Sequence, residues 1–539
     1  MREWKGAGRT LTVSKSIKHI GIVSALTMAS RVLGLVRESL TAAVFGAGAL
    51  VSAYFTGFLL PNLFRRFLAE GSLTAALVPT LNDELKEGDR ARGFRLVNQV
   101  ASWLLLVTGT LVVLAMVVLS RETLVAWLGE RVGADADAVE RWKLAAWFAV
   151  VLFPYLVFVS LSAAFSGALQ TLQKFVEPAL SPIWLNLAMI APLIAAWWWG
   201  GAEEVAIRWL CAGVLVGGFL QMAVPAWALR REGWRPRLDF ELSGPVRTIL
   251  RLMGPAVFSS SIYLINMSVS RLIGLSLNDE AVALLNFSQR LMELPIGVFA
   301  VAVSTVVFPL ISRYAAAGDW GNLASAYRKG MRLILVINIP AAAGLAVLAL
   351  PIIRVIFQHG AFESEAARAM TPVLVANALG LPFFSFVNLA LRAFYAEKDT
   401  RTPLRAAIVS FLVNVVLSLV LMGPLSTLGL AIASTAAIAV QAFHLQWHLA
   451  RRHEGLAFRH LAGDMGKVVL ASAAMALVVA AGWWGWGRMF APAKMSDLAG
   501  IVVLIAMGVS VYAGLVWLLK IEGREELRAM LKRGGRRGA

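Results

Sequence analysis

The segment Ser30-Arg31-Val32-Leu33-Gly34-Leu35 occurs a second time, slightly changed, as Ser270-Arg271-Leu272-Ile273-Gly274-Leu275. Each copy lies in a long apolar stretch, residues 17–46 and 246–275 respectively. Internal similarity between distant membrane segments is typical of transporters built from two related halves. We therefore expect a six-helix half, a second six-helix half in the same membrane orientation, and a central cavity between them.

The composition around these segments indicates a membrane protein. Of the 539 residues, 59% are hydrophobic and only 15% are charged, with a mean hydropathy of +0.72. The apolar runs are continuous and about 20 residues or longer, as membrane-spanning helices require, and do not alternate as barrel strands do. The chain is thus predicted to be an all-α integral membrane protein with about fourteen transmembrane helices.

The predicted spans divide the chain into three parts. They are 17–46, 52–81, 94–119, 143–168, 180–199, 205–229, 246–275, 281–311, 327–352, 369–391, 405–424, 426–450, 464–490 and 499–520. Residues 1–240 form the first lobe with helices 1–6, and residues 241–455 form the second lobe with helices 7–12. Residues 456–539 hold an appended helix pair and a basic tail.

The net charge of +18 reflects topology more than ligand binding. Basic residues are dispersed over short loops after even-numbered spans and in the tail, which makes those loops cytoplasmic by the positive-inside rule. Both termini are then cytoplasmic. A nucleic-acid-binding protein would instead concentrate these charges on one basic domain, so we expect no nucleic-acid partner.

Ionisable residues occur inside the first two predicted helices of each half, where they are costly to insert and therefore candidates for function. They are Arg31, Arg37 and Glu38 in helix 1, Arg65, Arg66 and Glu70 in helix 2, Arg271 in helix 7, and Arg290 and Glu293 in helix 8. Spacing predicts that Arg66 pairs with Glu70, Arg290 with Glu293 and Arg31 with Glu38. Arg37, Arg65 and Arg271 remain without a local partner in this scheme.

The surplus positive charge consists of arginine alone. A guanidinium stays charged when buried and presents a planar fork that matches phosphate oxygens. A proton relay would use titratable acids or histidines instead, so an anionic ligand such as a diphosphate fits the residues better. Mutual neutralisation of these charges, or their extension to the membrane surface, is the alternative.

Motifs for soluble catalytic chemistry are absent from the sequence. It contains no phosphate-binding P-loop, no His-Glu-x-x-His and no Gly-x-Ser-x-Gly. The single cysteine, Cys211, excludes an intrachain disulfide and a cysteine-based zinc cluster. We expect a transporter rather than an enzyme, without a metal site or a bound cofactor.

Three stretches resemble the MurJ (MviN) family of bacterial lipid II flippases. They are residues 30–38, residues 45–48 and the segment Leu60-Pro61-Asn62-Leu63-Phe64-Arg65-Arg66-Phe67-Leu68-Ala69-Glu70-Gly71, while Gln289-Arg290-Leu291-Met292-Glu293-Leu294-Pro295 is similar to the helix 8 signature of the family. The resemblance implies the fold of the multidrug/oligosaccharidyl-lipid/polysaccharide (MOP) exporter superfamily, with a lipid-tail groove in the last helix pair.

The resemblance also implies a function and a site. The expected activity is translocation of lipid II, an undecaprenyl-diphosphate-linked peptidoglycan precursor, from the cytoplasmic to the outer leaflet by alternating access. The expected substrate-binding residues are Arg31, Arg37, Glu38, Arg65 and Arg290, supported by Arg66, Glu70, Arg271 and Glu293. Location in the bacterial cytoplasmic membrane, coupling to membrane potential or an ion gradient, and contact with the peptidoglycan synthesis machinery are further expectations.

The sequence departs from the family pattern at three positions. Glu38 stands where the family usually has aspartate, and Ser52 stands where many members carry aspartate. Asn414 is followed one turn later by Ser418 rather than by aspartate, so we expect no sodium site there.

Three other functions stay open as alternatives. An exporter of another polyprenyl-diphosphate-linked glycan would need the same arginines. A drug/cation antiporter of the same superfamily would need an acidic cavity, because arginine repels an organic cation. The third alternative is a non-transporting membrane scaffold. Scaffold relatives are fused to kinase-like domains, and we expect no such domain in this sequence.

Overall fold

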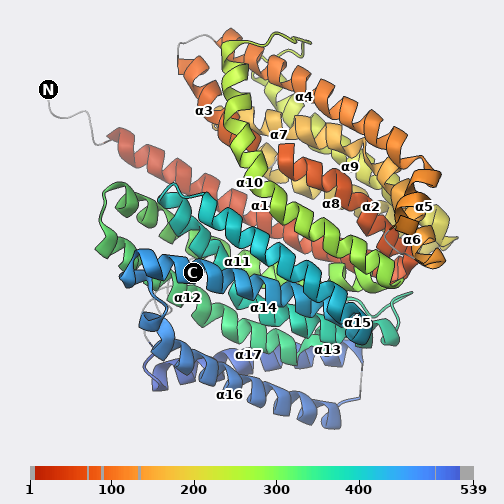
Figure 1. The fold of residues 1–539 in the computed structure, drawn as a ribbon, viewed down its shortest axis with the longest axis vertical. Coiled ribbons are helices and arrows are strands. Elements are labelled where there is room, and N and C mark those ends of the chain that lie inside the picture. Colours follow the sequence, from red (N-terminus) through yellow and green to blue (C-terminus); the bar gives the residue numbers. More distant parts are fainter. Residues whose placement is uncertain (1–6, 69–71, 87–89, 132–134, 492, 522–539) are drawn as a thin grey trace. The chain divides into compact units, whose positions relative to one another are not determined.

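The computed structural model describes residues 7–68, 72–86, 90–131, 135–491 and 493–521 (Figure 1). Side chains are described in these ranges except for residues 7–20, 64–68, 254–265, 296–306 and several single positions. All regular elements in the described ranges are helices, in agreement with the all-α prediction. Contacts divide the chain into two compact units, residues 1–282 and 283–539.

The first unit consists of ten helices within the described ranges. They are α1 (Ala7–Phe45), α2 (Ala49–Leu68), α3 (Ser72–Lys86), α4 (Arg90–Leu119), α5 (Glu122–Arg131), α6 (Ala136–Leu152), α7 (Tyr155–Thr171), α8 (Val176–Trp199), α9 (Glu203–Arg231) and α10 (Gly244–Leu277). The repeated segment lies in α1 and α10, and both of its glycines, Gly34 and Gly274, are buried. Since α10 packs on α2, α3 and α6, it belongs structurally to the first unit.

The core of the first unit lies where α3, α4, α7 and α9 meet. Leu77, Leu161, Phe165 and Trp234 are buried there in one apolar cluster. Helix α1 packs mainly on α8, and α2 packs mainly on α6. The α2–α6 contact is close because Gly57 has no side chain: a Cβ there would lie 2.6 Å from the Cβ of Phe148.

The second unit contains the remaining described helices. They are α11 (Ala281–Ala316), which begins at the boundary, α12 (Trp320–Val347), α13 (Ala349–Ile356), α14 (Ser364–Ala396), α15 (Arg401–Arg452), the short 3₁₀ helix η1 (Glu454–Leu456), α16 (Arg459–Met489) and α17 (Lys494–Leu518). Its core includes Tyr327, Met331, Phe394 and Leu445. Helix α16 packs on α12, where Arg332 and Asp464 form an ion pair at 2.9 Å.

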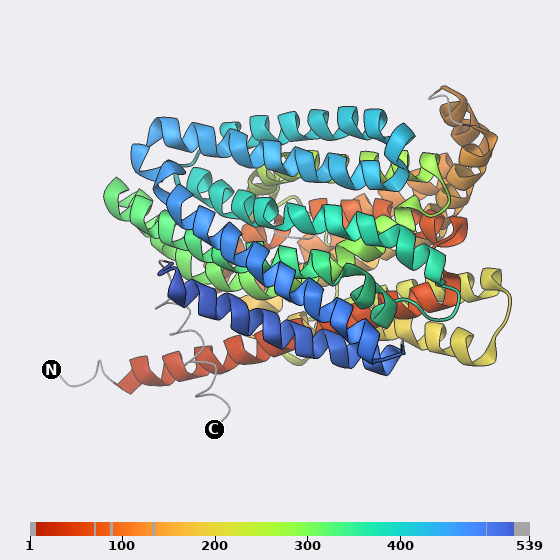
Figure 2. The ribbon, with the colours of Figure 1, turned by 90° about the horizontal axis from the view of Figure 1, so that it is seen from below.

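Helix α15 is a hairpin of two arms rather than one rod. Ser426 interrupts it with φ 50° and ψ −134°. The Ser410 hydroxyl donates to the Ala437 carbonyl at 3.0 Å, although 27 residues of straight helix would separate them by about 40 Å. The two arms, cyan and azure in Figure 2, lie side by side. The predicted spans 405–424 and 426–450 correspond to these arms.

Three predicted spans are each divided in two by the structure. Span 52–81 becomes α2 and α3, span 327–352 becomes α12 and α13, and span 143–168 becomes α6 and α7 with a 45° bend. Pro154 lies at that bend, and proline lacks the N–H that would continue the helix. Helix α5 was not predicted.

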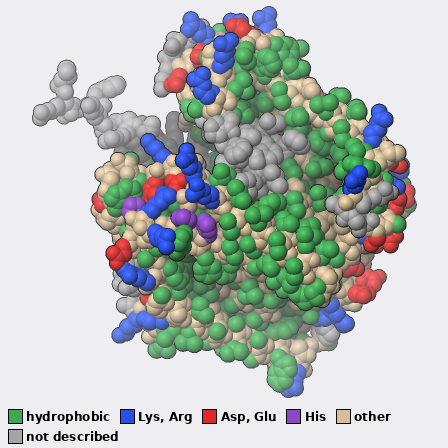
Figure 3. Space-filling model, in the orientation of Figure 1, with side chains coloured by type: hydrophobic (Ala, Val, Ile, Leu, Met, Phe, Trp, Pro, Cys, Tyr) green, Lys and Arg blue, Asp and Glu red, His purple; other side chains and the backbone are tan. Residues whose placement is uncertain are grey.

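Hydrophobic side chains cover much of the face of the molecule that Figure 3 shows. In the described ranges eight helices are long and apolar enough to cross a membrane, or nine if the bent pair α6 and α7 is counted. Leu114, Val416 and Val502, from α4, α15 and α17, are more than half exposed, as lipid-facing residues would be. The protein is thus a multi-pass membrane protein. The count of fourteen spans and the division at residues 240 and 455 stay predictions.

Candidate functional site

The Arg37 side chain is a largely buried member of the predicted arginine set. It lies in α1 and is only 16% exposed, while the neighbouring Glu38 side chain is 6% exposed. The Nη2 atom of Arg37 donates to the Glu38 carboxylate. Arg37 therefore has a local partner, which corrects the prediction that it lacks one. The charge pair is adjacent in sequence, a spacing that the helical pairing rule did not consider.

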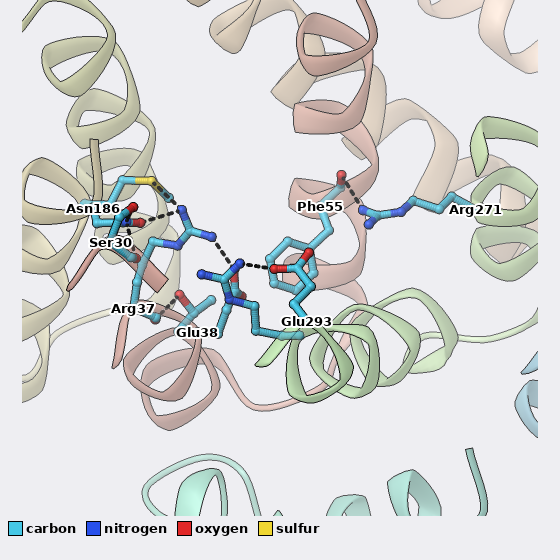
Figure 4. A network of polar contacts seen from close by, with 10 residues as sticks. Ser30, Arg37, Glu38, Phe55, Asn186, Arg271 and Glu293 are labelled. Carbon is cyan, nitrogen blue, oxygen red and sulfur yellow. Dashed lines mark hydrogen bonds and ion pairs between the residues drawn. The ribbon is translucent and has the colours of Figure 1, made fainter. Parts of the chain in front are cut away.

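Helix α8 supplies two further contacts of the Arg37 guanidinium (Figure 4). The Nη1 atom of Arg37 donates to the Asn186 amide oxygen at 3.1 Å and lies 3.6 Å from the Met189 sulfur. Asn186 and Met189 are three residues apart and therefore share one face of α8. Since α1 packs along α8, both ends of the guanidinium fork are held within the first unit.

Arg271 has a hydrogen-bond partner on another helix of the first unit, whereas the spacing rule concerned only local partners. It lies in the second copy of the repeated segment, on α10, and is partly buried. Its Nη1 atom donates to the backbone carbonyl of Phe55 in α2 at 3.3 Å (Figure 4). This contact ties α10 to α2.

The end of α10 is held by residues that sequence reasoning did not select. Arg141 of α6 donates to the carbonyls of Leu275 and Ser276 and to the Asp279 carboxylate. The Ser52 hydroxyl donates to the Asp279 carbonyl at 2.6 Å. Position 52, where many family members carry aspartate, thus makes a hydrogen bond to this connection.

In the second unit, Arg290 and Glu293 form the ion pair that their spacing predicts. The Arg290 side chain is 20% exposed and that of Glu293 is 46% exposed, so the acid is more open to water than the base. Both lie on α11, one turn apart. Arg290 is thus a partly buried cation whose counterion is half solvated.

The remaining predicted residues are less fully placed. Arg31 is partly exposed on α1, six residues before Arg37. The side chains of Arg65 and Arg66, at the end of α2, and the whole of Glu70 lie outside the described residues. The Arg66 to Glu70 pairing therefore stays a prediction.

The described ranges contain no group of three or more His, Cys, Asp or Glu side chains placed to hold a metal ion. Asn414 and Ser418 are both buried in the first arm of α15. The charged groups described at the site are the guanidinium groups of Arg37 and Arg290 with their carboxylate partners. A guanidinium that stays charged and partly buried binds phosphate oxygens more strongly than one in water.

Asn186 is the site residue that sequence reasoning missed. It is a buried amide, 5% exposed, in a helix that is apolar apart from Glu177 and Ser181 near its start. That contrast is a usable sequence signal, because an amide in an apolar membrane helix needs hydrogen-bond partners. What the sequence could not supply is the identity of the partner, which is 149 residues away in the chain.

Comparison with known proteins gives consistent matches. Residues 41–498 match the family model described as lipid II flippase MurJ. The probable lipid II flippase MurJ of Rhizobium meliloti (strain 1021) is 32% identical over 96% of both chains. That of Vibrio cholerae serotype O1 is 31% identical, covering 95% of this chain and 98% of the relative.

Solved structures show the same fold. A structure titled lipid II flippase MurJ, inward closed conformation, is 25% identical with a TM-score of 0.75, covering 94% of this chain and 99% of the other. An inward-facing multidrug resistance MATE transporter of the MOP superfamily is 16% identical with a TM-score of 0.62, covering 81% and 98%. The second likeness concerns the fold alone.

Proposed function

Since the chain belongs to the MurJ family of lipid II flippases, we propose that it carries lipid II from the cytoplasmic to the outer leaflet by alternating access, with Arg37 as a principal diphosphate ligand. The family consists of transporters, not enzymes. The observation that carries the assignment of Arg37 is its geometry. Its guanidinium is mostly buried in α1, is hydrogen-bonded to the Asn186 amide oxygen, and is paired with the Glu38 carboxylate.

The other site residues are assigned by family motif and charge. Arg65 and Arg290 contribute further positive charge to the diphosphate, and Arg31 and Glu38 shape the access path. Arg66, Glu70, Arg271 and Glu293 support these groups by pairing or by holding helices. The described ion pair of Arg290 and the carbonyl contact of Arg271 support this division.

The setting of this activity follows from the topology prediction. We place the protein in the bacterial cytoplasmic membrane with both termini in the cytoplasm, where lipid II is presented to it. Transport draws on membrane potential or an ion gradient rather than on a bound cofactor. The peptidoglycan synthesis machinery is the expected partner on the product side.

The test is lipid II translocation in reconstituted vesicles, with and without an imposed potential. The full chain and its Arg37→Ala, Arg65→Ala and Arg290→Ala variants are compared with Arg95→Ala, whose side chain is 62% exposed and pairs with Asp239 away from the site. We expect the three site variants to lose translocation and Arg95→Ala to retain it. Normal translocation by all three would overturn the assignment.

A flippase for a different polyprenyl-diphosphate glycan would use the same arginines and give the same variant pattern. Competition between lipid II and another undecaprenyl-diphosphate sugar for the purified protein separates the two functions. Preferential binding of lipid II is the expected result.

A further inference from the structure

Asn186 is a buried polar side chain whose two ends serve different partners. It lies in α8, an apolar helix, and is 5% exposed. Its amide nitrogen donates to the Ser30 carbonyl at 3.1 Å and lies 3.5 Å from the Ser30 hydroxyl. Its amide oxygen accepts from Arg37 at 3.1 Å. Because the nitrogen is held by a backbone carbonyl, the oxygen must face the guanidinium (Figure 4).

The acceptors around the Arg37 guanidinium are unequal in charge. Nη2 is directed to the Glu38 carboxylate, whereas Nη1 is directed to the neutral oxygen of Asn186 and the neutral sulfur of Met189. A neutral acceptor fixes the direction of a guanidinium without cancelling its charge. Because the Glu38 carboxylate already offers one negative charge to the guanidinium, a second carboxylate in this place would make the local charge negative.

We propose that Asn186 is a positioning residue for the substrate diphosphate: it orients the Arg37 fork without adding a negative charge beside it. The proposal rests on the proposed function of Arg37. Its chemical basis is that bidentate recognition of phosphate depends on the orientation of the guanidinium plane as well as on charge. The competing role is structural, in which the amide only joins α1 to α8.

A double-mutant cycle separates these roles. The affinity of the full chain in lipid nanodiscs for lipid II is measured for Asn186→Leu, Arg37→Ala and the combined variant. We expect Asn186→Leu to weaken binding about fivefold and the combined variant to bind no more weakly than Arg37→Ala, since the amide acts through that arginine. Independent, additive losses would overturn the proposal. If Asn186→Leu does not accumulate, Asn186→Ser takes its place, because serine stays polar but cannot reach Arg37.

A charge test uses two lipid probes, undecaprenyl diphosphate and uncharged undecaprenol. Asn186→Asp is expected to weaken binding of the diphosphate lipid about tenfold or more, through the added negative charge beside Arg37, and to leave undecaprenol binding within about twofold. An equal loss for both lipids would mean a general packing defect and would overturn the proposal.

Gln221→Leu is the matched control. Gln221 is a second buried amide of the same unit, 4% exposed, which accepts from the Tyr155 hydroxyl and donates to the Ser181 carbonyl without contacting Arg37. It should lower the melting temperature but show no coupling to Arg37→Ala. Coupling as large as that of Asn186 would also overturn the proposal. Unchanged lipid II binding by Arg37→Ala alone would instead contradict the proposed function of the site.

Discussion

Arg141 of α6 and Asp279, just beyond α10, form an ion pair at 2.9 Å in which the two partners differ sharply in exposure. The arginine side chain is 10% exposed and the aspartate side chain is 59% exposed. Two further bonds from the same guanidinium go to the Leu275 and Ser276 carbonyls at the end of α10. The backbone bonds, rather than the solvated ion pair, should therefore carry most of the stabilisation.

Arg141→Leu is predicted to destabilise the protein by about 2–3 kcal/mol, because it leaves two helix-end carbonyls without their charged donor. Asp279→Asn should cost about 1 kcal/mol or less, since an exposed pair contributes little. The free energy of unfolding of both variants in detergent, measured with denaturant, tests this difference. Equal losses would show that the ion pair itself holds α10.

Gly57→Ala is predicted to disturb the packing of α2 on α6. The added Cβ would lie 2.6 Å from the Phe148 Cβ and 2.7 Å from the Ala145 carbonyl oxygen. We expect a loss of about 1–3 kcal/mol, since the obstruction includes backbone. The control is Gly109→Ala in α4, where no atom lies within 4 Å of the new Cβ. That variant should match the parent or exceed it in melting temperature, since alanine favours a helix.

Glu293→Gln should weaken lipid II binding less than Arg290→Ala does. Removing the half-exposed acid leaves the positive charge of Arg290 in place. The lipid II affinity of Glu293→Gln should therefore stay within about threefold of that of the parent. Arg290→Ala removes a partly buried cation and should weaken binding by about tenfold or more. Titration of the purified variants with lipid II provides the comparison. A larger loss for Glu293→Gln would assign the acid, and not the arginine, to the substrate.

Cys211 is predicted to be unreactive in the folded protein. It lies in α9 and is 1% exposed, and a thiol must reach the reagent as a thiolate to react. Maleimide labelling should appear only after denaturation. Trp199→Cys, at an 83% exposed position, is the positive control and should label under native conditions. Rapid native labelling of Cys211 would contradict its burial.

Acid should weaken the connection between α14 and α15. Burial opposes the charge of Asp399, but hydrogen bonds from Thr402 and Arg452 outweigh it and lower the pKa of this carboxyl to about 2. A carboxyl with a lowered pKa stabilises the folded state fully above about pH 4 and loses this contribution as the pH falls towards 2.

Asp399→Asn should therefore be less stable than the parent near neutral pH and show a smaller further loss between about pH 4 and pH 3. Melting temperatures of parent and variant at pH 7, 4 and 3 test this. A pKa difference of one unit between the folded and unfolded states corresponds to about 1.4 kcal/mol of folding free energy. Identical pH profiles for parent and variant would exclude Asp399 as a contributor.

Most of the helical plan was predictable because membrane spans are recorded locally in the sequence. A run of apolar residues has to form a helix in lipid, and this rule placed both arms of α15 although one continuous helix would have been equally apolar. The break between α12 and α13 at Leu348 also had a local signal, because Pro351 lacks the N–H that would bond to the Val347 carbonyl, but the apolar run obscured it. The bend at Pro154 had a signal that the apolar run obscured.

The sequence alone determined the membrane class, the repeated segment and the arginine chemistry of the candidate site, because each depends on residue type and short spacing. Only the tertiary structure decided that Asn186 orients Arg37, that Arg271 contacts α2, and that Arg141 holds the end of α10. These contacts join residues more than a hundred positions apart. Their distances depend on how helices pack, which glycines such as Gly57 permit and which no local pattern of hydropathy encodes.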